Sequence, residues 1–240
     1  MSDNDLADPL FRERREAMRA ELAARDRAFL SENPERYDFF NLVYGRAGGD
    51  AAAVPWADLA PKPQIAAWIE AHPGTGMRAL DVGCGLGDHA EALAGAGYQT
   101  DAFDLAEDAI EWAKRRFPET QVRYRAMNLF EAPVGWRGAF DVVNECYTIQ
   151  SLPPPLHDKT ARAIASFVRP GGALLVYARV RDADGPWDGP PYPLTPNEQN
   201  LFARLGFVVE HDEAFALVRP DKTIEHRFTV WRRKFHSRQE

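Results

Sequence analysis

The chain contains 240 residues, of which 45% are hydrophobic and 27% are charged. This composition is close to that of soluble globular proteins, so it excludes a fully disordered chain and a collagen-like one. Lysine and arginine number 29 against 36 aspartates and glutamates, which gives a formal net charge of -7. Because such a chain repels a phosphate backbone on average, we expect no nucleic-acid partner.

The cysteine count and the N-terminus indicate a cellular compartment. Cys84 and Cys146 are too few for a disulfide scaffold, and no Cys or His spacing suggests a zinc site. The first residues are acidic where a signal peptide is basic, and no apolar run approaches the ~20 residues that span a bilayer. We therefore expect a cytoplasmic protein without a membrane-spanning segment.

The first elements are a charged helix and an aromatic segment. Residues 10–30 are rich in Ala, Glu and Arg, and Leu10, Met18, Leu22 and Phe29 recur at roughly helical spacing. This pattern predicts a helix on the surface. The aromatics of the next segment are Phe29, Tyr37, Phe39, Phe40, Tyr44, Trp56 and Trp68. They indicate either core packing or the lining of a pocket.

From about residue 77, short apolar runs alternate with amphipathic stretches, which is typical of a parallel sheet covered by helices on both faces. The expected strands are Arg78–Val82, Gln99–Asp104, Val122–Ala126, Phe140–Glu145, Ala173–Ala178, Phe207–His211 and His226–Phe235. The expected helices are Asp88–Ala96, Ala106–Phe117, Leu156–Phe167 and Pro196–Leu205. We therefore predict a Rossmann-like, doubly wound α/β fold with seven mostly parallel strands, an antiparallel C-terminal hairpin and an N-terminal helical cap.

A loop rich in proline interrupts this pattern. Residues 182–197 contain five prolines and two glycines, so they cannot form a helix interior or a central strand. Long loops are often lids or binding segments, and this one carries Trp187 and Tyr192.

The strongest functional signal is a glycine-rich turn between a strand and a helix. Gly83, Gly85 and Gly87 allow a tight turn and close approach of a ligand to a helix N-terminus. Asp104 ends the next strand, where a carboxylate can accept both hydroxyls of a ribose. A nucleotide-like ligand is therefore expected over the turn.

The glycine spacing separates two classes of cofactor. A dinucleotide fingerprint requires glycine at position 88, where this chain has Asp88. The carboxylates of Asp81 and Asp88 would repel a pyrophosphate but suit a cationic ligand end, such as that of S-adenosylmethionine.

The segment from Asp81 to Gly87 resembles motif I of the class I S-adenosylmethionine-dependent methyltransferases. The similarity continues through the strand from Phe140 to Tyr147 and the Arg169–Gly172 turn, and it covers about residues 64–235. It implies a cap segment at 1–63 and a cofactor-binding domain at 64–240, together one structural domain. The implied activity is methyl transfer, with S-adenosylhomocysteine as the product.

The resemblance also implies a set of cofactor-binding residues. In this family the residue at Asp104 binds the ribose, while Asn128 or its neighbour Met127 stands where an aspartate usually contacts the adenine amine. Asn128 is otherwise a simple turn residue. The expected cofactor-binding residues are Asp81, Gly83, Cys84, Gly85, Gly87, Asp104, Leu105, Asn128, Leu129, Glu145 and Trp56.

A shorter similarity concerns the methyl acceptor. Ala53–Trp56 and Pro61 resemble the N-terminal region of thiopurine, thiol and halide methyltransferases and tellurite-resistance proteins, where such a motif lies beside the sulfonium. Trp56 is otherwise a core aromatic. A thiol supplies thiolate without a strong base, and no base or metal cluster is evident in the sequence. A small thiol or other soft nucleophile is therefore the preferred acceptor.

Two alternatives remain open. One is methylation of a nitrogen or oxygen of a small metabolite, and the other is a non-catalytic cofactor-binding module that regulates a partner. Tyr44, Tyr147 and His157 could each reach a substrate or be structural, so no catalytic residue is assigned. Cys84 is expected to pack under the cofactor, and the basic residues 232–234 to lie on a solvated strand rather than to bind nucleic acid.

Overall fold

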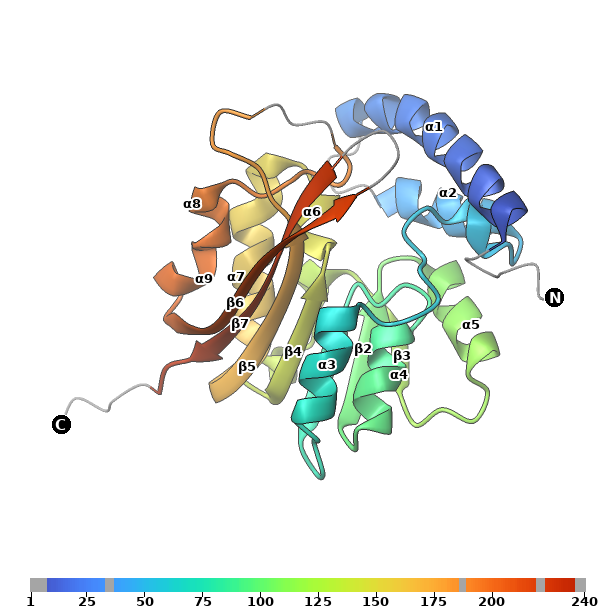
Figure 1. Ribbon diagram of the computed structural model, residues 1–240. Coiled ribbons are helices and arrows are strands. Elements are labelled where there is room, and N and C mark those ends of the chain that lie inside the picture. The colour runs from blue at the N-terminus through green and yellow to red at the C-terminus, as the bar shows by residue number, and fades with distance from the viewer. Residues whose placement is uncertain (1–7, 33–36, 186–188, 219–222, 236–240) are drawn as a thin grey trace.

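The computed structural model describes residues 8–32, 37–185, 189–218 and 223–235, with side chains from 8–22 and from 39 onward (Figure 1). The helices are α1 (Pro9–Glu32), α2 (Tyr37–Ala47), α3 (Pro63–Ala71), α4 (Asp88–Gly95), α5 (Glu107–Arg116), α6 (Thr148–Ser151), α7 (His157–Phe167), α8 (Pro196–Gln199) and α9 (Leu201–Arg204). Short 3-10 helices lie at η1 (Ala51–Ala53), η2 (Leu129–Glu131), η3 (Val134–Trp136) and η4 (Pro154–Leu156). The strands are β1 (Arg78–Val82), β2 (Gln99–Asp104), β3 (Arg123–Ala126), β4 (Phe140–Cys146), β5 (Val168–Arg179), β6 (Phe207–Val218) and β7 (Thr223–Arg233).

The described strands form one seven-stranded sheet in the order β3-β2-β1-β4-β5-β7-β6. Strands β1 to β5 pair in parallel, whereas β7 pairs antiparallel with both β5 and β6. The strand order reverses at β1, which places the glycine turn where ligands bind in open α/β sheets. The predicted fold class, including the antiparallel C-terminal hairpin, is confirmed.

Neighbouring residues of a strand point to opposite sides of the sheet. In the central strands, both sets of residues are buried. In β4, Val142 packs with the cluster formed by α3 and α4, whereas Val143 packs with that formed by α7 and α9. Leu174 and Leu175 of β5 divide in the same way. Helices therefore cover both faces, as Figure 1 shows.

The C-terminal hairpin is longer than predicted. Polar residues at 211–213 suggested an early end to β6, but the strand continues to Val218 and pairs with β7 down to Thr223. Cross-strand ion pairs hold these polar positions, since Arg227 donates to Asp212 Oδ1 at 2.6 Å. Tertiary pairing overrode the local signal.

The predicted helix at 196–205 is divided into α8 and α9. Thr195 and Glu198 form a reciprocal capping box at the start of α8, with Pro196 in the first turn. The Asn200 side chain then donates to the Pro196 carbonyl at 2.9 Å, and α9 begins afresh at Leu201. A side chain that competes for a backbone carbonyl thus accompanies the break.

Helix α1 confirms the predicted charged helix, but its buried contact differs from the expected apolar stripe. Leu10 is 63% exposed, whereas Phe11 is fully buried against η1 and α5 residues. Arg15 is also buried and donates to the Ala51 carbonyl at 3.0 Å. The helix therefore packs against the rest of the protein, and Figure 1 shows it lying with α2 beside the carboxyl ends of the strands.

Among the helices of the described residues, none combines the length and the apolar character that a membrane span requires.

Candidate functional site: a cofactor cradle facing a polar acceptor wall

A cleft of about 790 Å³ opens at the carboxyl ends of β1, β2, β4 and β5. Its floor includes Gly83 after β1, Asp104 at the end of β2 and Tyr147 after β4. Helix α1 closes the opposite side with Glu16 and Arg19, so this helix contributes to the cleft wall. This volume is ample for a small-molecule ligand.

The glycine turn uses backbone conformations that favour glycine. Gly83, Gly85 and Gly87 have φ values of 64°, 51° and 90°. A Cβ on Gly83 would lie 2.5 Å from Thr148 Oγ1, and one on Gly87 would lie 2.3 Å from the Tyr124 hydroxyl. The turn therefore has no room for side chains at these two positions, and Gly83 and Gly85 line the cleft.

Asp104 lies against this turn with its carboxylate at the cleft wall. Its Oδ2 accepts from the Gly85 N–H at 2.9 Å, and its Oδ1 accepts from the Ala106 N–H at 3.0 Å. Burial raises the pKa of Asp104, and these backbone hydrogen bonds oppose the shift. A carboxylate has about four acceptor positions, so the two that remain suit a pair of ligand hydroxyls.

Asp81 and Glu145 lie beneath the turn and do not line the cleft. Asp81 Oδ1 accepts from Asn144 Nδ2 at 2.7 Å, and Glu145 Oε1 accepts from the Ile149 N–H at 2.9 Å. Among the described residues, the second oxygen of each carboxyl has no hydrogen-bond partner. Burial raises the pKa of Asp81 and of Glu145 to about 7. Both groups can therefore respond to a cation placed above the turn.

Asp88 does not supply the free negative charge that its position in the sequence suggested. Arg116 binds it with two hydrogen bonds, of 2.7 and 3.1 Å, and also donates to the Leu86 carbonyl. This bidentate pair neutralises Asp88 at the start of α4. The electrostatic preference for a cationic ligand therefore rests on Asp81 rather than on both carboxylates.

The adenine side of the predicted site is mainly apolar. Leu105, Met127 and Leu129 line the cleft together with Asn128. Asn128 Oδ1 accepts from the Phe130 N–H at 3.0 Å and caps η2. Asn128 therefore has the turn role that the sequence left open, at a position where it also faces a ligand.

An aromatic wall covers the glycine turn from the N-terminal segment. Trp56 Nε1 donates to the Tyr44 hydroxyl at 2.7 Å, and the two rings meet edge to face. Phe40 packs edge to face on Trp56, and all three residues line the cleft. Trp56 is 36% exposed, so it is a lining residue rather than a core aromatic.

Cys84 lines the cleft within the glycine turn. Burial, followed by the charges of Asp104 and Asp81, raises the pKa of its thiol well above the usual value. The thiol therefore stays protonated and is not a nucleophile. This agrees with the packing role expected for it.

The opposite end of the cleft is polar, and its arrangement was not predicted from the sequence. The Tyr147 hydroxyl lies 2.8 Å from His226 Nε2, although the two residues are 79 positions apart. Lys62 lies 5.0 Å from the centroid of the Tyr147 ring, and the Arg179 guanidinium lies 5.9 Å from it. Tyr147 was a predicted candidate, whereas His226, Lys62 and Arg179 were not. The pairing of β5 with β7 brings Arg179 beside His226, and Lys62 comes from the start of α3.

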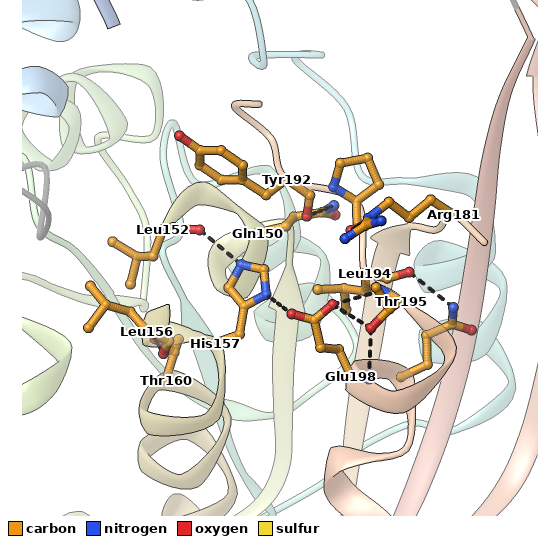
Figure 2. Close-up of polar contacts among 12 residues, drawn as sticks. Gln150, Leu152, Leu156, His157, Thr160, Arg181, Tyr192, Leu194, Thr195 and Glu198 are labelled. Atoms are coloured by element: carbon orange, nitrogen blue, oxygen red, sulfur yellow. Dashed lines mark hydrogen bonds and ion pairs between the residues drawn. The ribbon is translucent and has the colours of Figure 1, made fainter. Parts of the chain in front are cut away.

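The proline-rich loop is fastened behind the cleft by a buried polar network. Figure 2 shows His157 between the Leu152 carbonyl and the Glu198 carboxylate, at 2.9 and 2.6 Å. Glu198 also accepts from the backbone N–H of Thr195 at 2.8 Å. Burial would raise the pKa of Glu198, but the hydrogen bonds from His157 and Thr195 outweigh it and lower that pKa to about 2. His157 is therefore a structural anchor and does not line the cleft.

This network holds the loop against the cleft. Gly189, Pro190 and Pro191 line the cleft, whereas Tyr192 is buried outside it and its N–H donates to the Gln150 carbonyl at 2.7 Å. Trp187, the other aromatic singled out in this loop, lies outside the described residues. Within the described ranges, no group of three or more His, Cys, Asp or Glu side chains could hold a metal ion.

Comparison with family models identifies residues 79–172 as a match to the model described as "Methyltransferase domain". The ubiquinone biosynthesis O-methyltransferase of Bordetella avium is 37% identical over 109 residues, which cover 44% of each chain. The protein of the same name from Xanthomonas campestris is 38% identical over 103 residues, or 42% of each chain. The chain thus matches less than half the length of these curated relatives.

Among solved structures, 1,6-didemethyltoxoflavin-N1-methyltransferase from Burkholderia thailandensis, with bound S-adenosylhomocysteine, superposes with a TM-score of 0.62. It is 23% identical, and the match covers 83% of this chain and 87% of the other. The family model thus supports a methyltransferase domain over the segment that contains the glycine turn, and the solved structure supports the fold. The finer resemblance to thiol methyltransferases gains no support from them.

Proposed function

We propose that this chain is an S-adenosylmethionine-dependent methyltransferase of small molecules and that its acceptor atom is a hydroxyl oxygen. The observation that carries the cofactor assignment is the cradle formed by the glycine turn and Asp104, which opens into the cleft. When bound, the cofactor supplies a methyl group already activated by the sulfonium. The two curated relatives are named O-methyltransferases, which supports oxygen as the accepting atom.

The residues at the cleft fit this cofactor. Asp104 would hold the ribose, the Gly83–Gly85 backbone would lie against the amino-acid part, and Leu105 and Leu129 would flank the adenine. Asp81 would contribute its charge from beneath the turn. The remaining task of the chain is to hold the acceptor in line with the methyl group and to exclude water. Trp56, Tyr44 and the loop at 189–191 would close that space.

A thiol acceptor is the second candidate. Trp56 lies over the glycine turn and faces the cleft, as the resemblance to thiol methyltransferases implies. The other ground for a thiol was that no base was evident in the sequence, and the polar wall around Tyr147 and His226 weakens it.

The proposed function is tested by measuring S-adenosylhomocysteine release with a panel of phenols, alcohols, thiols, hydrogen sulfide, halides and amines. We expect turnover with hydroxyl acceptors and inhibition when S-adenosylhomocysteine is added at the start. Turnover confined to thiols or halides would support the second candidate. Cofactor binding without turnover across the panel would favour a regulatory module.

A further inference from the structure

The pair of Tyr147 and His226 has a defined direction of hydrogen bonding. His226 Nδ1 lies 2.8 Å from the Ile224 carbonyl, and a carbonyl oxygen can only accept, so Nδ1 carries the proton. The Nε2 atom of the neutral ring is then an acceptor, and the Tyr147 hydroxyl donates to it at 2.8 Å. The tyrosine oxygen keeps two acceptor positions, and Tyr177 is a hydrogen-bonding neighbour of this hydroxyl, which leaves an acceptor position for a proton from elsewhere.

The backbone places Tyr147 at this position at a cost. Its φ is 64°, in the left-handed region that bulky residues rarely adopt, directly after β4. Such conformations are strained for residues other than glycine, and they cluster at functional sites. The strained residue is also the one whose ring enters the cleft beside the end of β1.

His226 is set rigidly behind the tyrosine. It is 1% exposed, stacks on Phe215 with ring centroids 5.4 Å apart, and contacts the Tyr177 ring at 5.7 Å. Two adjacent strands therefore fix the imidazole, since Phe215 is its partner on β6 and Tyr177 lies on β5. A base held in this way needs little reorganisation during a proton transfer.

We propose, resting on the function proposed above, that Tyr147 and His226 form a proton relay that deprotonates a hydroxyl acceptor. As the acceptor oxygen bonds to the methyl carbon, the bond from that carbon to sulfur breaks and its electron pair stays on the sulfur. The acceptor proton passes to the Tyr147 oxygen while the Tyr147 proton passes to His226 Nε2. The imidazolium formed keeps its Nδ1–H bond to the Ile224 carbonyl and later releases one proton to water. Tyr147 is the catalytic residue, and His226 acts through it.

The surroundings favour a relay over a tyrosinate base. Burial, with added repulsion from Cys146 and Tyr177, raises the pKa of Tyr147 well above its usual value, so the hydroxyl stays protonated at neutral pH. It can then accept a proton only by giving up its own to His226. Lys62 and Arg179 flank the ring and would stabilise negative charge on the acceptor oxygen.

Other titratable groups lie near the relay and contribute to the pH dependence of turnover. Lys62 is paired with Asp58, and Glu213 of β6 is hydrogen-bonded to Gln64 at 3.3 Å. Arg179, the Cys146 thiol and the Tyr177 hydroxyl are further titratable neighbours of the relay among the described residues.

The test uses Tyr147→Phe, His226→Gln and the double variant of the full chain, with Tyr98→Phe as the control. Tyr98 is chemically matched because its hydroxyl donates to the His72 carbonyl at 2.6 Å, away from the cleft. With an unactivated phenol at neutral pH, we expect each relay variant to lose about 100-fold in kcat, a typical contribution of a general base. The double variant should lose no more than a single one, and cofactor affinity should stay unchanged.

The acceptor series separates proton transfer from a structural defect. With para-nitrophenol, which is already ionised near neutral pH, the loss in kcat should shrink to less than about threefold, because no base is required. Raising the pH should restore the variants with the unactivated phenol. Equal losses with both phenols, or unchanged turnover of the unactivated phenol, would overturn the relay.

A second measurement does not depend on turnover. In cofactor-free protein, the visible absorbance of bound para-nitrophenol reports its ionisation, which the wild-type relay should increase relative to His226→Gln. Equal ionisation in both proteins would overturn the relay. If the wild type releases no S-adenosylhomocysteine with any acceptor, the proposed function is overturned instead. The absorbance measurement would still show whether Tyr147 and His226 deprotonate a bound phenol.

Discussion

The two ends of the cleft differ in how the chain builds them. The cofactor end comes from one continuous stretch of chain, since Gly83, Gly85 and Asp104 lie on one β1-α4-β2 unit. The acceptor end is assembled from Lys62, Tyr147 and His226, which belong to three distant parts of the chain. A local motif can therefore identify the cofactor, whereas the acceptor chemistry appears only when the sheet is complete.

The largest effect is expected from removing the Asp104 carboxylate at the cofactor end. Asp104→Ala should weaken S-adenosylmethionine binding about 100-fold or more, because it removes a carboxylate that binds hydroxyls and leaves the Gly85 and Ala106 N–H groups unpaired. Isothermal titration calorimetry measures the loss. Asp104→Asn, which keeps one acceptor oxygen, should lose less. Unchanged S-adenosylmethionine affinity in Asp104→Ala would show that the cofactor does not bind at Asp104.

Trp56 tests whether the two ends are separable. Trp56→Phe removes the indole donor to Tyr44 but keeps an aromatic ring, so the acceptor KM should rise about tenfold while the cofactor Kd changes less than about twofold. Steady-state kinetics and calorimetry give the two numbers. Tyr44→Phe is the matched variant, since it removes the same hydrogen bond from the other side. An equal loss in both constants would mean that Trp56 serves the cofactor.

The pH dependence of cofactor binding sharpens the view of the cofactor end. Asp81 has a pKa raised to about 7 by burial, and a bound cation favours the ionised carboxylate and lowers that pKa. Binding should therefore release protons, and affinity should rise about fivefold between pH 6 and 8. Calorimetry in buffers of different ionisation enthalpy counts the protons. Asp81→Asn should flatten the profile, and a flat wild-type profile would refute the linkage.

The smallest effect is expected behind the acceptor end. The Glu198 pKa is lowered to about 2, so its contribution to stability is complete above the ordinary carboxyl value and is lost as pH falls toward 2. Glu198→Gln should lower the free energy of unfolding at pH 7 by about 1 kcal/mol, with a smaller loss at pH 3. Chemical denaturation at both pH values measures this. Glu210→Gln, on the exposed β6 edge, is the control, and equal effects would argue against a loop anchor.

The fold was predictable because its signals are local. The boundaries of β1 and β2 were predicted without error, since each is a short apolar run that ends at a glycine turn or a carboxylate. The long hairpin was not predictable, because the polar residues at 211–213 of β6 are held by ion pairs to β7 that a single strand does not reveal. The division between cap and domain at residue 63 stays a prediction.

The strands of the sheet, the glycine turn and the place of Asp104 at the end of a strand followed from the sequence alone, because backbone conformation and hydrophobic alternation act over a few residues. The tertiary structure decided what each charged or polar group does. It paired Asp88 with Arg116, buried Asp81 and Glu145 below the cleft, and placed His226 behind Tyr147. Hydrogen bonds and burial between distant residues set these roles, and they exist only after the strands have paired.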